Sequence, residues 1–201
     1  MKTSTALATL LYTFSDAVNK LTIPIPEGTA LFAPADETLD MCQAYAQDGW
    51  TFAFRKDHVN ALAACAYGGG WMDAGLAYGL LEMKEPIAEP PMMKGIVAAW
   101  NYPLSDDMTT RLTEKTQRYR KMFTNAIKSI APAPDSATTT HRFATAVEKE
   151  ATDVLTLGNK PYDSPNLTTP LVWYSYGYGW LDMAVRAGVL RVTGDRSLFT
   201  I

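Results

Sequence analysis

The sequence predicts an all-α protein made of two tandem three-helix up-and-down bundles. Apolar residues recur at three- and four-residue steps along much of the chain, and alternating strand-like runs are nearly absent. The run YGGGWMDAGLAYGLL at residues 67–81 also returns as YGYGWLDMAVRAGVL at residues 176–190. A second landmark, PIPEG at residues 24–28, faces PAPDS at residues 132–136 at nearly the same offset. These two landmarks together indicate an internal duplication.

The first unit is predicted to span residues 5–83. Its first helix carries one apolar stripe, formed by Leu7, Leu10, Leu11, Phe14, Val18 and Leu21. Pro24 and Pro26 stop this helix, because proline lacks the amide hydrogen and crowds the preceding turn. A similar stripe in the second helix consists of Leu39, Cys42, Ala46, Gly49 and Ala53. The helices expected in this unit cover residues 5–22, 31–55 and 58–82.

The second unit is predicted to span residues 106–192 and to repeat this order. Pro132 and Pro134 again separate its first two helices. The helices expected here cover residues 106–130, 137–157 and 168–191. Between the units, residues 84–105 form a proline-rich linker, in which residues 92–100 are apolar enough to form a short helix. Residues 193–201 are expected to form a C-terminal tail.

The third helix of each unit is expected to be central, because it is apolar on all sides. It is also rich in glycine, which costs up to about 1 kcal/mol relative to alanine inside a helix. Such glycines make sense where two backbones approach closely. We therefore expect one face to pack on the unit's own helices and the other to meet the third helix of the other unit across a pseudo-two-fold axis. The chain would then be a monomer with an internal pseudo-dimer.

The repeated core supplies the candidate residues for binding a ligand or partner: Tyr67, Trp71, Asp73, Tyr176, Trp180 and Asp182. The two aspartates stand out, because a buried charge without partners is very costly. Each could accept a hydrogen bond from a Trp or Tyr side chain or cap a helix N-terminus. They could instead approach each other across the axis, where like charges would raise one pKa, or lie exposed at a groove.

Composition and motifs argue against several classes of function. A net charge of −3 gives no general positive field, so no nucleic-acid partner is expected. No apolar run approaches the roughly 20 residues of a membrane span, and the N-terminal run, interrupted by threonines, is not expected to be a signal peptide. Neither a phosphate-binding loop nor a metal-ligating histidine pattern occurs. We therefore expect no catalytic residues, no metal and no cofactor.

Two further groups of side chains need an interpretation. Cys42 and Cys65 are too few for a disulfide framework, so we expect reduced, buried thiols in a cytoplasmic protein. The helix expected at residues 106–130 carries three cations one turn apart, opposite its apolar stripe: Arg111, Lys115 and Arg118. A phosphate-binding face is conceivable there, but a solvated helix surface is the preferred interpretation.

The run ALAACAYGGGWMDAGLAYGLL, preceded by PIPEG and an acidic amphipathic helix, resembles the short archaeal family catalogued as domain of unknown function 357. Members of that family end in an alanine-rich helix with a Tyr/His-Gly-Trp-Leu-Asp-Ala-like core. The first unit resembles the family over its whole length. In the second, NKPYDSPNLTTPLVWYS replaces the short alanine-rich segment, whereas the matching positions include Tyr176, Gly177, Gly179, Trp180, Leu181, Asp182, Gly188 and Leu190. The resemblance implies a three-helix bundle and no catalytic residues.

Two functions from different classes remain open. A non-enzymatic interaction or scaffold protein with a protein partner is favoured by the missing catalytic motifs. The aromatic cluster in the second unit also favours it, although these side chains could simply fill the core: Trp173, Tyr174, Tyr176, Tyr178 and Trp180. The alternative is a small-molecule binding protein or enzyme, with a Tyr/Trp/Asp-lined pocket between the two units.

Overall fold

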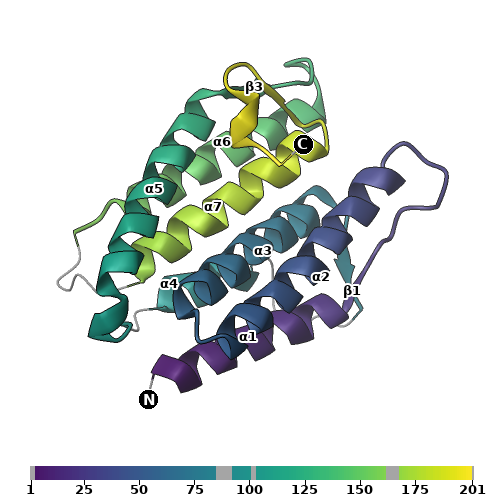
Figure 1. Ribbon diagram of the computed structural model, residues 1–201. Coiled ribbons are helices and arrows are strands. Elements are labelled where there is room, and N and C mark those ends of the chain that lie inside the picture. Colours follow the sequence, from purple (N-terminus) through teal and green to yellow (C-terminus); the bar gives the residue numbers. More distant parts are fainter. Residues whose placement is uncertain (1–2, 85–91, 101–102, 162–167, 201) are drawn as a thin grey trace.

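The computed structural model describes residues 3–84, 92–100, 103–161 and 168–200 (Figure 1). It is mostly helical, which confirms the helical character predicted from the sequence. The α-helices are α1 (Thr3–Asn19), α2 (Phe32–Phe54), α3 (His58–Tyr78), α4 (Met92–Ala99), α5 (Thr109–Lys128), α6 (Thr139–Gly158) and α7 (Thr169–Arg186). Short 3-10 helices, η1 (Asp106–Met108) and η2 (Arg196–Leu198), precede α5 and follow α7.

The linker contains the short helix that its composition predicts, because residues 92–99 form α4. The rest of that linker includes residues 85–91 and 101–102, which lie outside the described residues. Within the described ranges, none of the helices combines the length and the apolar character that crossing a bilayer requires.

Helices α3 and α7 lie side by side at the centre of the molecule (Figure 1). Helices α1 and α2 pack against α3, and α5 and α6 pack against α7. Helix α4 contacts both central helices. Because α3 and α7 are covered by helices on several sides, their side chains are buried along most of their length.

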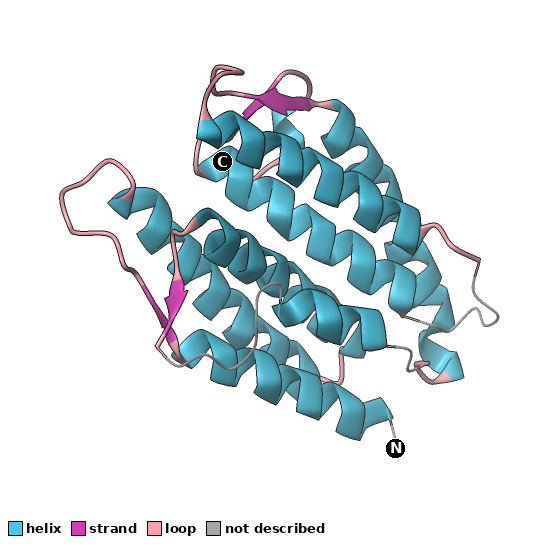
Figure 2. Ribbon diagram, turned by 180° about the vertical axis from the view of Figure 1, so that it is seen from behind, coloured by secondary structure: helices cyan, strands magenta, loops and turns pink. Residues whose placement is uncertain are grey.

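The prediction of an all-α chain was wrong at the ends of four helices, where short antiparallel ribbons form (strands in Figure 2). Strand β1 (Leu21–Thr22) pairs with β2 (Glu82–Met83), so that Leu21 lies opposite Met83. Strand β3 (Ile130–Pro132) pairs with β4 (Leu190–Val192), so that Ile130 lies opposite Val192. One ribbon therefore joins the chain just after α1 to the chain just after α3, and the other joins the chain just after α5 to the chain just after α7.

Glycine explains why the third helices end earlier than predicted. Gly79 and Gly188 adopt the left-handed conformation, with φ of 80° and 70°, which is accessible to glycine at little cost. The following amides then turn back to the helix: Leu80 N–H donates to Gly75 O at 2.9 Å, and Val189 N–H donates to Ala184 O at 2.8 Å. The chain thus leaves both helices in the same way and enters the ribbons.

Both tryptophans of the repeated motif lie in the core. Trp71 and Trp180 are only 1% and 7% exposed. The prediction of buried thiols is confirmed as well, since Cys42 and Cys65 are both buried and not disulfide-bonded. Burial raises the pKa of both thiols well above its ordinary value, so neither is an activated nucleophile.

Candidate functional site

The repeated glycine-rich core lies where the two central helices touch. A Cβ added to Gly70 would lie only 3.1 Å from the Cα of Gly179 and closer still to the carbonyl oxygen of Tyr176. A Cβ on Gly179 would likewise collide with the carbonyl oxygen of Tyr67. Only glycine fits at either position, which confirms that this pair brings the two helices together.

Around this contact, each central helix donates a tyrosine hydrogen bond to the aspartate of the other. Tyr67 Oη donates to Asp182 Oδ2 at 2.5 Å, and Tyr176 Oη donates to Asp73 Oδ2 at 2.9 Å. Both carboxylates are buried, with 0% exposure for Asp73 and 1% for Asp182. Burial, followed by the charge of the neighbouring aspartate, raises the pKa of each phenol well above its ordinary value. Both phenols therefore keep their protons and act as donors.

Each aspartate also holds the segment that follows its own unit. Asp73 accepts hydrogen bonds from the amides of Met93 and Lys94, at 3.2 and 2.9 Å, in the first turn of α4. Asp182 accepts from the amide of Thr200 at 3.3 Å and from its hydroxyl at 3.2 Å. Of the three accounts that the sequence left open, the structure therefore supports hydrogen-bond acceptance and helix capping. The two carboxylates occupy separate hydrogen-bond networks rather than one shared site.

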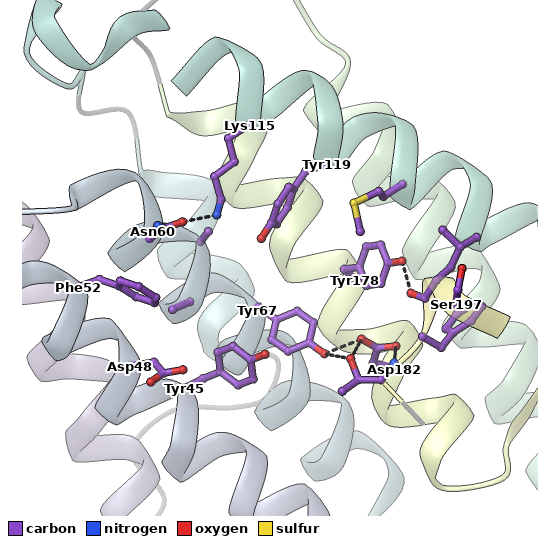
Figure 3. Close-up of a pocket in the computed structure, with 16 residues that line it drawn as sticks. Tyr45, Asp48, Phe52, Asn60, Tyr67, Lys115, Tyr119, Tyr178, Asp182 and Ser197 are labelled. Carbon is purple, nitrogen blue, oxygen red and sulfur yellow. Dashed lines mark hydrogen bonds between the residues drawn. The ribbon is translucent and has the colours of Figure 1, made fainter. Parts of the chain in front are cut away.

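A cavity of about 410 Å³ opens between the two units, next to Asp182 (Figure 3). Helices α2 and α3 form one side of it, and α5, α7 and the residues around η2 form the other. Its walls include four tyrosines, Tyr45, Tyr67, Tyr119 and Tyr178, and its charged side chains are those of Asp48, Lys115 and Asp182. Residues 197–200, predicted as part of a tail, are thus one wall of a cavity.

Asp182 and Lys115 are the two charged side chains of this cavity whose pKa values move toward neutrality, whereas burial raises the pKa of its four tyrosines. Burial raises the pKa of Asp182 to about 6, although the hydrogen bonds from Tyr67 and Thr200 oppose this effect. Burial and the charge of Arg118 lower the pKa of Lys115 to about 8. Both groups therefore change charge closer to neutrality than an exposed side chain of the same type.

Lys115 does not lie on a freely solvated surface, which corrects the preferred interpretation of its stripe. Its Nζ donates to Asn60 Oδ1 on α3 (Figure 3) and lies 4.7 Å from the centroid of the Tyr119 ring. Arg111 forms an ion pair of 2.5 Å with Asp57, the N-cap residue of α3. Two of the three cations of the stripe thus bridge α5 to α3.

Comparison with known families identifies both units. The sequence model of a family described as "Protein of unknown function (DUF357)" matches residues 4–81 and again residues 118–190, which together make up most of the chain. The chain belongs to this family. The second DUF357 match begins inside α5 rather than at residue 106. No match was found among the curated proteins or among the solved structures.

Each DUF357 segment contributes one of the six candidate residues to the cavity. Of the six candidate residues, Tyr67 and Asp182 line it, whereas the other four fill the core or the helix contact: Trp71, Asp73, Tyr176 and Trp180. The aromatic cluster of the second segment is also buried, at 7% exposure or less for each member. These aromatic side chains therefore fill the core, which was one of the two interpretations of the cluster, and do not form an exposed interaction surface.

Sequence reasoning missed Tyr45, Tyr119 and Lys115 as members of one site. These residues come from α2 and α5, two helices that contact the cavity from opposite sides. No spacing along the chain relates them. The stripe of Arg111, Lys115 and Arg118 was the one available signal. It was weak, because a lysine in a solvated stripe and a lysine that faces another helix have the same helical spacing.

Proposed function

We propose that the cavity between the two DUF357 segments binds a small, flat organic molecule. The observation that supports this proposal is a cavity of about 410 Å³ with four tyrosines in its walls, and with Lys115 and Asp182 among its polar groups. Cavities of this size are within the range of natural ligand sites, which are usually apolar or aromatic with a few well-placed polar groups.

The side chains of the cavity suit a planar ligand. The Tyr45 and Tyr67 rings lie 4.5 Å apart between centroids, tilted by 59°, so their faces and edges offer aromatic contacts to a further ring. Lys115 and Asn60 supply polar groups from one part of the wall, and Asp182 supplies an oxygen from another (Figure 3). A ligand would therefore be oriented by its own polar groups.

The proposal also draws on the internal duplication. We propose that the two segments are tandem three-helix bundles related by a pseudo-two-fold axis, since the Tyr–Asp hydrogen bond and the ribbon each occur twice and equivalent glycines, Gly70 and Gly179, meet at one contact. Under this arrangement α4 fills the side next to Asp73, where Met93 packs on Gly69. Next to Asp182, residues 197–200 occupy the equivalent side, and the cavity lies beside them.

Filling the cavity with a side chain tests the proposal. Ala64 on α3 is 5% exposed and lines the cavity, so Ala64→Phe should occupy the space of a ligand ring. Ala77→Phe on the same helix is the matched control, because Ala77 is exposed and does not line the cavity. Saturation-transfer NMR with a library of small aromatic compounds should give hits with the parent and with Ala77→Phe that disappear in Ala64→Phe. Hits that survive in a folded Ala64→Phe protein would contradict the proposal.

A second candidate function, protein interaction, rests on a different surface. Tyr12 and Phe54 are 68% and 82% exposed, and both contact the Trp50 ring, with centroids 4.7 and 6.0 Å away. We define these three residues as the aromatic patch. Exposed aromatic side chains of this kind are frequent in interface hot spots, so the patch supports the scaffold hypothesis.

Affinity capture from a native lysate with mass spectrometry tests the aromatic patch. A partner bound through it should be captured by the parent and by Ala64→Phe, but lost from the double variant Tyr12→Ser/Phe54→Ser. Equal capture by that double variant would exclude the patch as the binding surface.

A further inference from the structure

A second hollow adjoins the tyrosine-lined cavity and shares two of its residues. It has a volume of about 400 Å³, and its wall consists of Asn60, Arg111, Glu114, Lys115 and Arg118. Asn60 and Lys115 also line the first cavity. The ammonium group of Lys115 therefore stands at the boundary between an aromatic space and a polar one.

The second hollow has an excess of positive charge. Three cations line it and only one carboxylate, that of the exposed Glu114. Arg111 is paired with Asp57, but Arg118 forms no ion pair with any residue that the structure describes. A guanidinium with free N–H groups beside a half-buried ammonium is an arrangement that oxyanions bind well.

We propose that the two hollows form one binding site for a phosphorylated aromatic compound, with its phosphate at Lys115 and Arg118 and its ring among the tyrosines. This inference rests on the proposed function, since it specifies the class of ligand for the same cavity. Phosphate matches the hollow because its several oxygens can accept hydrogen bonds from Lys115 and Arg118 together.

The charges around the tyrosine-lined cavity favour one orientation of such a ligand. Asp48 and Asp182 both line that cavity, and neither lines the second hollow. Their negative charges repel a phosphate from the aromatic space and leave the cationic hollow as its place. The ring is then the part of the ligand that reaches Tyr67 and Asp182.

Three probes separate the contributions of ring and phosphate. Isothermal titration calorimetry at pH 7 would compare phenyl phosphate, phenol and inorganic phosphate on the intact protein. We expect phenyl phosphate to bind at least about tenfold more tightly than either fragment, because it alone makes both the aromatic and the charge-assisted contacts. Inorganic phosphate that binds as tightly as phenyl phosphate would overturn the joint site.

Matched charge variants on α5 complete the test. Arg118→Gln should weaken phenyl phosphate binding about tenfold while leaving phenol binding unchanged. Arg120→Gln removes the same charge from an exposed position outside both hollows and should change neither affinity. If phenol and phenyl phosphate bind equally, and only Ala64→Phe reduces both, the phosphate inference fails and the proposed function stands. If no aromatic probe binds, the proposed function fails with it.

Discussion

Gly70 and Gly179 meet backbone to backbone at the centre of the molecule, and each leaves no room for a Cβ on the other helix. This contact explains why the motif Tyr-Gly-x-Gly-Trp-x-Asp occurs twice. The glycine allows the approach, the tryptophan fills the core, and the tyrosine of one copy bonds to the aspartate of the other. The repeated residues are thus complementary halves of one intramolecular interface.

A side chain at the glycine contact should destabilise the protein strongly. Gly70→Leu or Gly179→Leu would force α3 and α7 apart, and we expect the free energy of unfolding to fall by about 3 kcal/mol, measured by urea denaturation. Gly95→Ala on α4 is the control, because its added Cβ has open space. It should raise stability by about 0.5–1 kcal/mol through the better helix propensity of alanine. Unchanged stability in either leucine variant would contradict the packing argument.

The exchanged tyrosine–aspartate hydrogen bonds should be energetically coupled. Tyr67→Phe leaves the buried Asp182 without its phenol donor, so we expect a loss of about 2 kcal/mol, with a similar loss for Tyr176→Phe. Asp73→Asn and Asp182→Asn should also lower the melting temperature. Tyr12→Phe, which removes an exposed hydroxyl, should stay within about 0.5 kcal/mol of the parent.

A double-mutant cycle between Tyr67→Phe and Asp182→Asn isolates this pair from other effects. The two changes should cost less together than the sum of their separate costs. Additive costs would mean that the two side chains do not stabilise each other. An asparagine variant that melts like the parent and yet loses ligand binding would assign the carboxylate to function rather than to folding.

The helices and their contact could be predicted because both depend on local patterns. Apolar spacing locates the helix faces, and the glycines of the third helices mark a close approach before any partner is known. The sequence could not specify which donor each aspartate would meet. Tyr67 and Asp182 are 115 positions apart, and their pairing depends on the relative placement of two whole helices.

The ribbons were missed for a different reason. Strands of two or three residues are too short to show an alternating pattern. The glycines after α3 and α7 were nevertheless a usable signal, since glycine just past an apolar helical run is a common helix stop. Reading Gly79 and Gly188 as stops would have ended both helices close to their observed ends.

If the duplicated chain forms its pseudo-dimer internally, it should be a monomer in solution. The surfaces around Gly70 and Gly179 are already used within one chain, and Arg186 pairs with Glu37 across the two units at 2.6 Å. Multi-angle light scattering at micromolar concentration should therefore give a mass near 22.1 kDa. A mass twice as large that persists on dilution would contradict this expectation.

Stability should depend on pH through Asp182. Its carboxyl has a pKa of about 6 in the folded protein, against an ordinary value of 3.8 for an aspartate. Between these two values the folded state binds more protons than the unfolded state, so this group makes the protein more stable as the pH falls from about 6 to 4. The whole effect amounts to about 3 kcal/mol.

Comparing the parent with Asp182→Asn isolates that contribution, because asparagine has a similar shape and does not titrate. The groups facing this carboxyl, Tyr67, Thr200 and Arg186, remain in both proteins. Urea denaturation at pH 4, 5, 6 and 7 should show the stability advantage of the parent growing toward pH 4 and levelling off above pH 6. A difference that is constant across this range would mean that the pKa of Asp182 is the same in the folded and unfolded chains. Burial would then not raise the pKa of this carboxyl.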